Sequence, residues 1–154
     1  MKKIFILKLI IFNTILFYSC DRNVMEIPVE INISNETGKS MEIHVFESVS
    51  QNFVKKIEIT NGNMVSRIFM EKESDSPIGP KDFFEGDSIS IVFGTNEKIL
   101  TSQCQYFIAS ESCAIEGNIL NISDSRWQLE NNGDTVIRSY TFMPEDFENA
   151  EPIN

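Results

Sequence analysis

The chain has 154 residues, a formal net charge of −10 and a hydrophobic fraction of 42%. The length fits one domain, and the hydrophobic fraction is too high for a chain that is disordered throughout. The excess of acidic residues repels phosphate backbones, which excludes nucleic-acid binding as the main function. One His and three Cys leave few residues for metal or triad chemistry.

The first twenty residues have the pattern of an export signal. Two lysines precede an apolar run over 4–18, which is followed by Ser19 and Cys20. A basic start, a short apolar segment and a small residue before the cleavage point are typical of secretory signals. The run is shorter and more interrupted than the roughly 20 apolar residues that a membrane span needs. We therefore predict that residues 1–19 are a signal peptide.

The cleavage point, Phe17-Tyr18-Ser19-Cys20, resembles the lipobox of bacterial lipoproteins, although Phe17 stands where Leu is usual. The resemblance implies that Cys20 carries a diacyl group and an amide-linked acyl chain, which together suffice for stable membrane anchoring. An uncleaved anchor, or an ordinary signal followed by an unrelated Cys, are the alternatives. Cleavage leaves 10 basic and 23 acidic residues, a net charge of −13, and we assign 20–25 as a tether.

The rest of the chain is rich in Ile and Val, and β-branched residues favour strands. Apolar side chains alternate with polar ones over 27–33, which predicts a first strand. Pro28 lies inside this segment and indicates an edge strand or a bulge. The same alternation over 41–45 predicts a second strand.

A third strand is predicted over 53–59, with Phe53 and the two isoleucines of the segment at positions of the same parity. The Asn61-Gly62 pair that follows is a strong signal for a hairpin, because both central positions of a type I′ turn need positive φ. We therefore expect 64–70 to return along the third strand and pair with it.

The second half of the chain alternates short apolar runs with turn residues. Asn132-Gly133 predicts another hairpin turn, and Pro144 with the acidic residues after it favours a short terminal helix. The expected elements are a polar loop over 71–81, a hairpin of 88–93 and 98–108 around 94–97, short strands over 119–122 and 127–129, and a strand over 136–142.

Many short strands at regular spacing predict an all-β fold, namely an antiparallel β-sandwich with a short C-terminal helix. We assign one sandwich domain to 26–150 and a C-terminal tail to 151–154.

Residues 140–150 read Tyr-Thr-Phe-Met-Pro-Glu-Asp-Phe-Glu-Asn-Ala. With the lipobox and the acidic, β-rich body, this segment resembles the small cell-envelope lipoproteins of Bacteroidota, many of which end in a strand followed by Glu-Asp-aromatic-x-x-Ala. The resemblance implies an Ig-like or transthyretin-like sandwich at the outer membrane, in a family of unassigned function. Pro144 departs from the usual pattern, so Cys20 alone is carried over as a functional residue.

Cys104 and Cys113 are separated by eight residues. An even pair at hairpin distance favours a disulfide in an oxidising envelope compartment. Two buried free thiols or a redox pair are the alternatives.

The chain shows no catalytic motif. His44 is the single His, so a zinc site of the usual ligands would need both remaining cysteines as well. Its alternation with inward residues predicts a surface or inter-strand position. There is no Gly-x-Ser-x-Gly, and His44 has no distinguished serine or cysteine partner for a triad. We expect no metal and no cofactor.

Two acidic clusters offer oxygen ligands of the kind that Ca²⁺ takes, but neither has the spacing of a known calcium loop, so we expect solvated loops. They consist of Glu71, Glu73 and Asp75, and of Asp82, Glu85 and Asp87.

The tripeptides Asp-Ser-Ile at Ser88 and Asp-Thr-Val at Thr135 resemble the O-glycosylation sequon of exported Bacteroidota proteins. They make these two residues candidate modification sites, although so short a pattern also arises by chance. Trp127 is expected to pack in the core, the alternative being an aromatic face that binds carbohydrate or peptide.

Together these features predict a lipid-anchored, non-enzymatic binding or assembly accessory of the outer membrane. The acyl chains on Cys20 would hold it at the membrane, and loops or an exposed edge strand would contact an envelope protein or glycan. Two other classes stay open. One is a carboxylate-based glycan hydrolase, and the other is a small protease inhibitor whose reactive element is the loop between Cys104 and Cys113.

Overall fold

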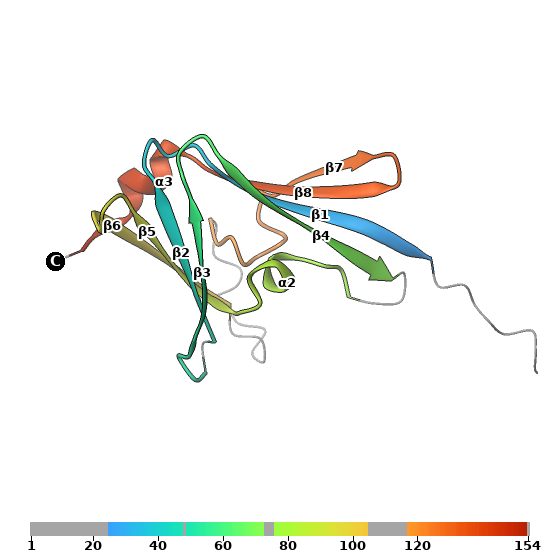
Figure 1. Ribbon diagram of the computed structural model, residues 1–154, viewed down its shortest axis with the longest axis horizontal. Coiled ribbons are helices and arrows are strands. Elements are labelled where there is room, and N and C mark those ends of the chain that lie inside the picture. Colours follow the sequence, from blue (N-terminus) through green and yellow to red (C-terminus); the bar gives the residue numbers. More distant parts are fainter. Residues whose placement is uncertain (1–24, 48, 73–75, 105–116, 154) are drawn as a thin grey trace, which may run out of the picture.

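The computed structural model describes residues 25–47, 49–72, 76–104 and 117–153; the predicted signal peptide, Cys20 and Cys113 lie outside these ranges. The described residues form two β-sheets with two short helices at their margins (Figure 1). The fold is an all-β sandwich with a small C-terminal helix, as the sequence predicts.

Sheet A contains, in spatial order, β4 (Met64–Lys72), β1 (Glu26–Asn35), β8 (Thr135–Phe142) and β7 (Gln128–Asn132). β1 pairs antiparallel with β4 and parallel with β8, and β7 pairs antiparallel with β8. The parallel pair departs from the antiparallel pattern that we expected. The chain makes it by sending β8 back beside its first strand in the same direction.

Sheet B contains, in spatial order, β3 (Phe53–Ile59), β2 (Met41–Phe46), β5 (Ser88–Phe93), β6 (Lys98–Gln103) and β9 (Glu151–Pro152), all antiparallel. Helix α2 (Pro80–Phe84) lies between β4 and β5 in the chain, and α3 (Pro144–Asn149) follows β8. β9 lies within 151–154, so part of the segment that we assigned to a tail belongs to sheet B.

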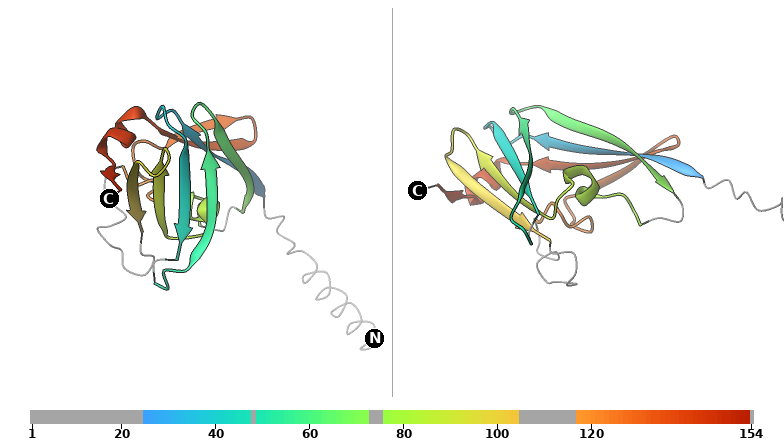
Figure 2. Two further views of the ribbon diagram at one scale, coloured as in Figure 1. Left: turned by 60° about the vertical axis from the view of Figure 1, so that its left-hand side comes forward. Right: turned by 60° about the horizontal axis from the view of Figure 1, so that its bottom comes forward.

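The core forms where alternate residues of the strands point between the two sheets. Its fully buried members come from both sheets, from α2 and from the 117–127 segment: Val29, Ile31, Ile33, Met41, Ile43, Val45, Ile89, Ile91, Phe93, Phe83, Phe84, Ile119, Tyr140 and Phe142. Sheet A is the longer layer. The start of β1 and the β7–β8 hairpin project beyond sheet B (Figure 2).

The Asn61-Gly62 turn joins the two sheets rather than two paired strands. β3 belongs to sheet B and β4 to sheet A, so the predicted hairpin between them is wrong. Gly62 has a φ of +76°, but its N–H donates to the Asn35 carbonyl at the end of β1, at 2.7 Å. The Asn35 N–H in turn donates to the Asn63 carbonyl at 3.0 Å. These bonds attach the turn to β1, and β4 then continues along β1.

Pro28 lies in a strand with neighbours on both sides, which contradicts the predicted edge position. The ladder between β1 and β8 begins only at Val29, so Pro28 lies where β1 is still paired on one side. A residue without an N–H is tolerated at such a strand end.

A change of register between Val45 and Phe46 turns Phe53 outward. Val45 lies opposite Lys55, whereas Phe46 lies opposite Phe53, so β3 has one extra residue there. Phe53 therefore does not lie on the same face as Ile57 and Ile59, as the common parity predicts: its side chain is 59% exposed, and Val54 packs against the core instead.

The other two predicted hairpins are confirmed, since β5 pairs with β6 and β7 pairs with β8. The strand predicted over 119–122 is wrong, because this segment forms consecutive turns. Asn118, Asn121 and Asp124 each accept, with a side-chain oxygen, the N–H two residues later, at 2.9 to 3.1 Å. Such turns compete with strand pairing.

Candidate functional site

Of the three cysteines, Cys104 alone lies within the described residues. Cys104 is disulfide-bonded and lies after β6, partly buried against the core. Cys113, its predicted partner, and Cys20, the predicted lipid attachment site, lie outside the described residues. The Cys104–Cys113 pairing and the lipidation of Cys20 therefore stay predictions.

The two candidate glycosylation residues differ in exposure. Ser88 lies in β5 between Phe46 and Gln103 of the neighbouring strands and is only 6% exposed. Thr135 begins β8 next to the Gly133 turn and is half-buried. In the folded domain, Thr135 is therefore the more accessible of the two hydroxyl groups.

Two described residues of the acidic clusters accept hydrogen bonds from the backbone. Glu71 accepts the N–H of Ile78 at 2.7 Å, and Asp82 accepts the N–H of Gly79 at 2.8 Å at the start of α2. Within the described ranges, which omit Glu73 and Asp75, no group of three His, Cys, Asp or Glu residues could hold a metal ion.

Glu85 joins α2 to a strand of each sheet. Its carboxylate lies 2.9 Å from Lys55 of β3 and 2.5 Å from Arg67 of β4. Hydrogen bonds from Lys55, and then from Arg67, lower the pKa of Glu85. Both cations also donate to the carbonyl of Phe83, at 3.0 and 3.2 Å. The arrangement caps the end of α2 and holds the helix against β3 and β4.

His44 lies on the outer face of sheet B, as its alternation predicts. Its Nε2 is 3.0 Å from the Glu42 carboxylate, and its ring meets Phe53 edge-on. The hydrogen bond with His44, and then that with Lys56, lower the pKa of Glu42. Glu42 and His44 are half-buried and Lys56 is exposed, and the three side chains form a polar cluster on the outer face of sheet B.

Replacing His44 by Ala is expected to raise the pKa of Glu42, because the largest contact that stabilises the charged carboxylate is lost. In the native protein this lowered pKa means that the contact stabilises the fold above the ordinary pKa of Glu, and that the stabilisation is lost as pH falls through the lowered value. A carboxyl-carbon NMR titration measures it, with Lys56→Ala expected to give a smaller rise. An unchanged pKa in H44A would contradict the assignment.

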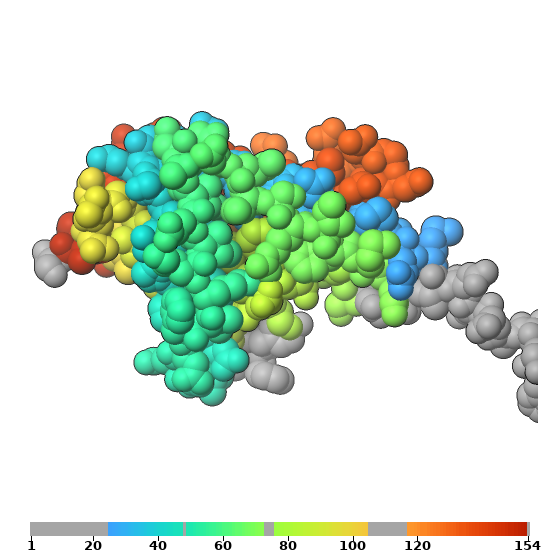
Figure 3. Space-filling model, in the orientation of Figure 1, coloured from blue at the N-terminus to red at the C-terminus, as the bar shows by residue number. Residues whose placement is uncertain are grey.

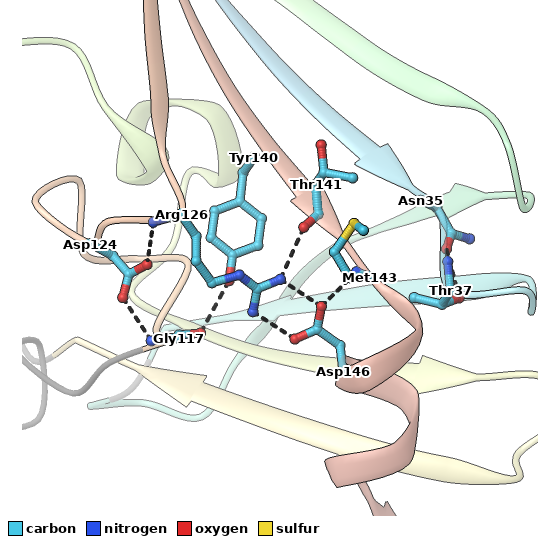
Figure 4. A network of polar contacts seen from close by, with 9 residues as sticks. All are labelled: Asn35, Thr37, Gly117, Asp124, Arg126, Tyr140, Thr141, Met143 and Asp146. Atoms are coloured by element: carbon cyan, nitrogen blue, oxygen red, sulfur yellow. Dashed lines mark hydrogen bonds and ion pairs between the residues drawn. The ribbon is translucent and has the colours of Figure 1, made fainter.

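The most extensive polar network joins the 117–127 segment to β8 and α3 (Figure 4). Arg126 donates to both carboxylate oxygens of Asp146 at 2.6 Å and to the Thr141 carbonyl at 2.9 Å. Asp146 is 8% exposed, and the Arg126 guanidinium lies 4.6 Å from the centre of the Tyr140 ring. The bonds to Asp146 raise the pKa of Arg126, so the guanidinium is charged at every accessible pH.

Asp124 extends the network by accepting the N–H groups of Gly117 and Arg126, at 2.7 and 2.9 Å. The Tyr140 hydroxyl donates to the Gly117 carbonyl at 3.2 Å, and burial raises the pKa of Tyr140. Trp127 donates to the Ile119 carbonyl at 3.0 Å and packs against the core, as expected. Arg126 pairs with Asp146, and Asp124 bonds to two backbone N–H groups, so the network fastens the 117–127 segment to the sandwich.

A hollow lies at the projecting end of sheet A, between the start of β1 and the β7–β8 hairpin. Two carboxylates, those of Glu26 and Asp134, line it, and its described lining contains no aromatic side chain. Glu26 is also paired with Lys72 at 3.8 Å. The hollow therefore lacks the aromatic platform that a glycan site ordinarily uses.

Apolar side chains project from the outer face of β4. Met64, Ile68 and Met70 are 54%, 68% and 53% exposed, and they alternate with half-buried residues on the other face. β4 is the end strand of sheet A. In the part of the chain that the structure describes, no backbone group over 65–72 bonds to backbone outside β1. We call this strand, with its three exposed apolar side chains and its unpaired side, the β4 edge.

Sequence reasoning missed the β4 edge because both faces of the strand mix apolar and polar residues. The inward face carries Arg67 and Glu71 beside Val65 and Phe69, so alternation alone does not indicate which side is buried. The Arg126–Asp146 pair was missed as well, since twenty residues separate its members. The repeat of Asn118, Asn121 and Asp124 at intervals of three was a usable signal for the turns around it.

No family model, no curated protein and no solved structure matches the chain. No helix among the described residues is long and apolar enough to cross a membrane.

Proposed function

We propose that this protein is a lipid-anchored, non-enzymatic binding or assembly accessory of the outer membrane, and that it contacts its partner through the β4 edge. The exposed β4 edge is the observation that carries the proposal. The lipobox-like residues ending at Cys20, and the resemblance to small lipoproteins of Bacteroidota, support the anchor and the location.

The physical basis is strand addition. An end strand presents unpaired N–H and C=O groups along its free side, and a partner strand can extend the sheet by bonding to them. Main-chain bonds supply affinity in this mode, and the alternate side chains supply specificity. Met64 and Met70 suit a binding surface because the unbranched methionine side chain adapts to the shape that it meets.

Site-specific crosslinking in the native envelope tests this function. A photoreactive residue at Ile68 is expected to form adducts with a neighbouring protein, whereas one at Leu129 is not. Leu129 is a matched control, because it is also 68% exposed and lies on β7, the opposite end strand of sheet A. The same cells carrying Cys20→Ala are expected to lose the protein from the membrane fraction.

Equal adducts at the two positions, or none at Ile68, would show that the β4 edge is not the contact surface. Retention of C20A at the membrane would contradict the lipid anchor and would leave the proposed β4 contact surface unaffected.

A further inference from the structure

We propose that the partner of the β4 edge is the β4 edge of a second copy of this chain, paired antiparallel about a two-fold axis at Phe69. The inference rests on the proposed function, since it names the occupant of the same surface. It comes from two properties of the strand: it is the least protected edge of the sandwich, and it is complementary to itself.

The other end strands carry the features that ordinarily prevent edge-to-edge pairing. β3 has the exposed Lys56 on its outer face and a register shift against β2. β7 is five residues long and wholly exposed, with Glu130 at its centre, and β9 has only two residues.

β4 differs from all three. It pairs with β1 over nine consecutive positions with no change of register, and it contains no proline. Its outward side chains include Met64, Ile68 and Met70, each more than half exposed. The inward charges of Arg67 and Glu71, which could protect an edge, are bonded to Glu85 and to the Ile78 N–H of their own chain. Figure 3 shows the green atoms of this region on the visible face.

The strand sequence pairs well with itself in one register. A two-fold axis perpendicular to the sheet keeps the outward faces of both copies together, and residues equally distant from the axis oppose each other. With the axis at Phe69, Ile68 opposes Met70 of the second copy. On the inward face, Arg67 lies opposite Glu71 of the second copy, so this register sets unlike charges across the pair while each keeps its contacts within its own chain. Opposed apolar residues and opposed unlike charges both stabilise antiparallel pairs.

Neighbouring registers lose one or both of these matches. An axis at residue 67 or 71 places Arg67 or Glu71 opposite its own copy, and opposed like charges destabilise a pair. An axis at Ile68 places Glu71 opposite Val65 and Lys72 opposite Met64. The Phe69 register is the one that matches both faces.

The β4 edge does not share the strong negative charge of the rest of the chain. The chain carries a net charge of −10, so contact between two copies is opposed over most of the molecule. β4 itself carries two cations, Arg67 and Lys72, against one anion, Glu71. The lipid anchor would strengthen a weak pair further, because tethering to one membrane raises the effective concentration.

The first test measures the mass of the full chain in detergent micelles by sedimentation velocity, over about 1 to 200 μM. The wild-type chain is expected to dimerise. Ile68→Glu is expected to weaken the dimer by roughly 100-fold, since the residue enters the interface twice. Leu129→Glu is the control of equal exposure and should leave the dimer unchanged. Circular dichroism confirms that each variant is folded.

The second test fixes the register. Met70→Lys alone should weaken the dimer, as Ile68→Glu does. The double variant I68E/M70K should recover at least tenfold of the lost affinity, because each new carboxylate opposes a new ammonium group of the other copy. Failure of the double variant to recover would overturn the Phe69 register.

A wild-type chain that stays monomeric over the whole range, or a dimer weakened equally by L129E, would overturn the second copy as partner. The crosslinking test at Ile68 then decides the proposed function separately. Adducts with a different protein would leave that function standing with another occupant, and the absence of adducts would overturn both.

Discussion

Replacing Arg126 by Met is expected to destabilise the folded domain by about 3 kcal/mol. The substitution keeps an apolar stem against the Tyr140 ring but removes the guanidinium, which donates to Asp146 and to the Thr141 carbonyl. Asp146 is 8% exposed. Of the contacts to its carboxylate that Figure 4 draws, the variant would keep the bond from the Met143 N–H, at 2.7 Å. An unpaired buried charge is costly because neither water nor a counter-ion replaces the lost partner.

Urea unfolding of the full chain, with the disulfide intact, measures this effect. Lys39→Met is the control, since Lys39 pairs with Glu97 at 2.9 Å on the surface, where both side chains are 40% or more exposed. That variant is expected to lose less than about 1 kcal/mol. Arg126→Lys should fall between the two, because it keeps the charge and loses the two-pronged geometry. A loss in R126M no larger than in K39M would show that the network does not hold the 117–127 segment.

Replacing Asn35 by Asp is expected to cost about 3 kcal/mol at neutral pH. Asn35 is fully buried, and its amide nitrogen donates to the carbonyls of Lys39 and Ile59, at 2.8 Å each. Its amide oxygen accepts from the N–H and the hydroxyl of Thr37. An aspartate of the same shape would point an acceptor at two carbonyl oxygens, so donors are lost and repulsion is added.

The pH dependence distinguishes this cause from a general loss of packing. Burial raises the pKa of the introduced carboxyl in the folded state, so the destabilisation is present above the pKa of the unfolded chain, about 4. It is expected to be largest above the raised pKa of the folded state, to shrink as pH falls through that raised pKa, and to level off below the pKa of the unfolded chain. Asn63→Asp is the matched control, because that side chain is exposed and donates to the Thr60 hydroxyl of the same turn. Equal losses in the two variants, or a loss in N35D that is independent of pH, would contradict the role of Asn35.

The turn between β3 and β4 shows what a local sequence pattern does not determine. Asn61-Gly62 forms a turn in the structure, as predicted, because the positive φ of Gly62 is a local property. Whether the two strands beside the turn pair with each other is a separate question. Asn35 lies 24 residues before Ile59 and bonds to both the end of β3 and the turn. These bonds attach the turn to β1, so β3 and β4 do not pair with each other. No local pattern contains that information.

The candidate site shows the same division. The alternation over 64–70 predicts a strand, but whether that strand lies in the middle or at the edge of a sheet depends on which other strands pair with it. β4 became an end strand because β1 accepted it on one side and β8 on the other. The Arg126–Asp146 pair likewise required β8 and α3 to bring Asp146 back to a segment twenty residues earlier.

By itself, then, the sequence determined the strands over 27–33, 41–45 and 88–93, the terminal helix after Met143, and the acidic charge of the whole chain. These properties depend on side-chain alternation, capping and composition, all of which act over a few residues. Sheet membership, the outward turn of Phe53 and the exposure of the β4 edge were decided only in the tertiary structure. They depend on contacts between segments far apart in the chain, where several pairings satisfy the same local pattern and the buried bonds of residues such as Asn35 select one.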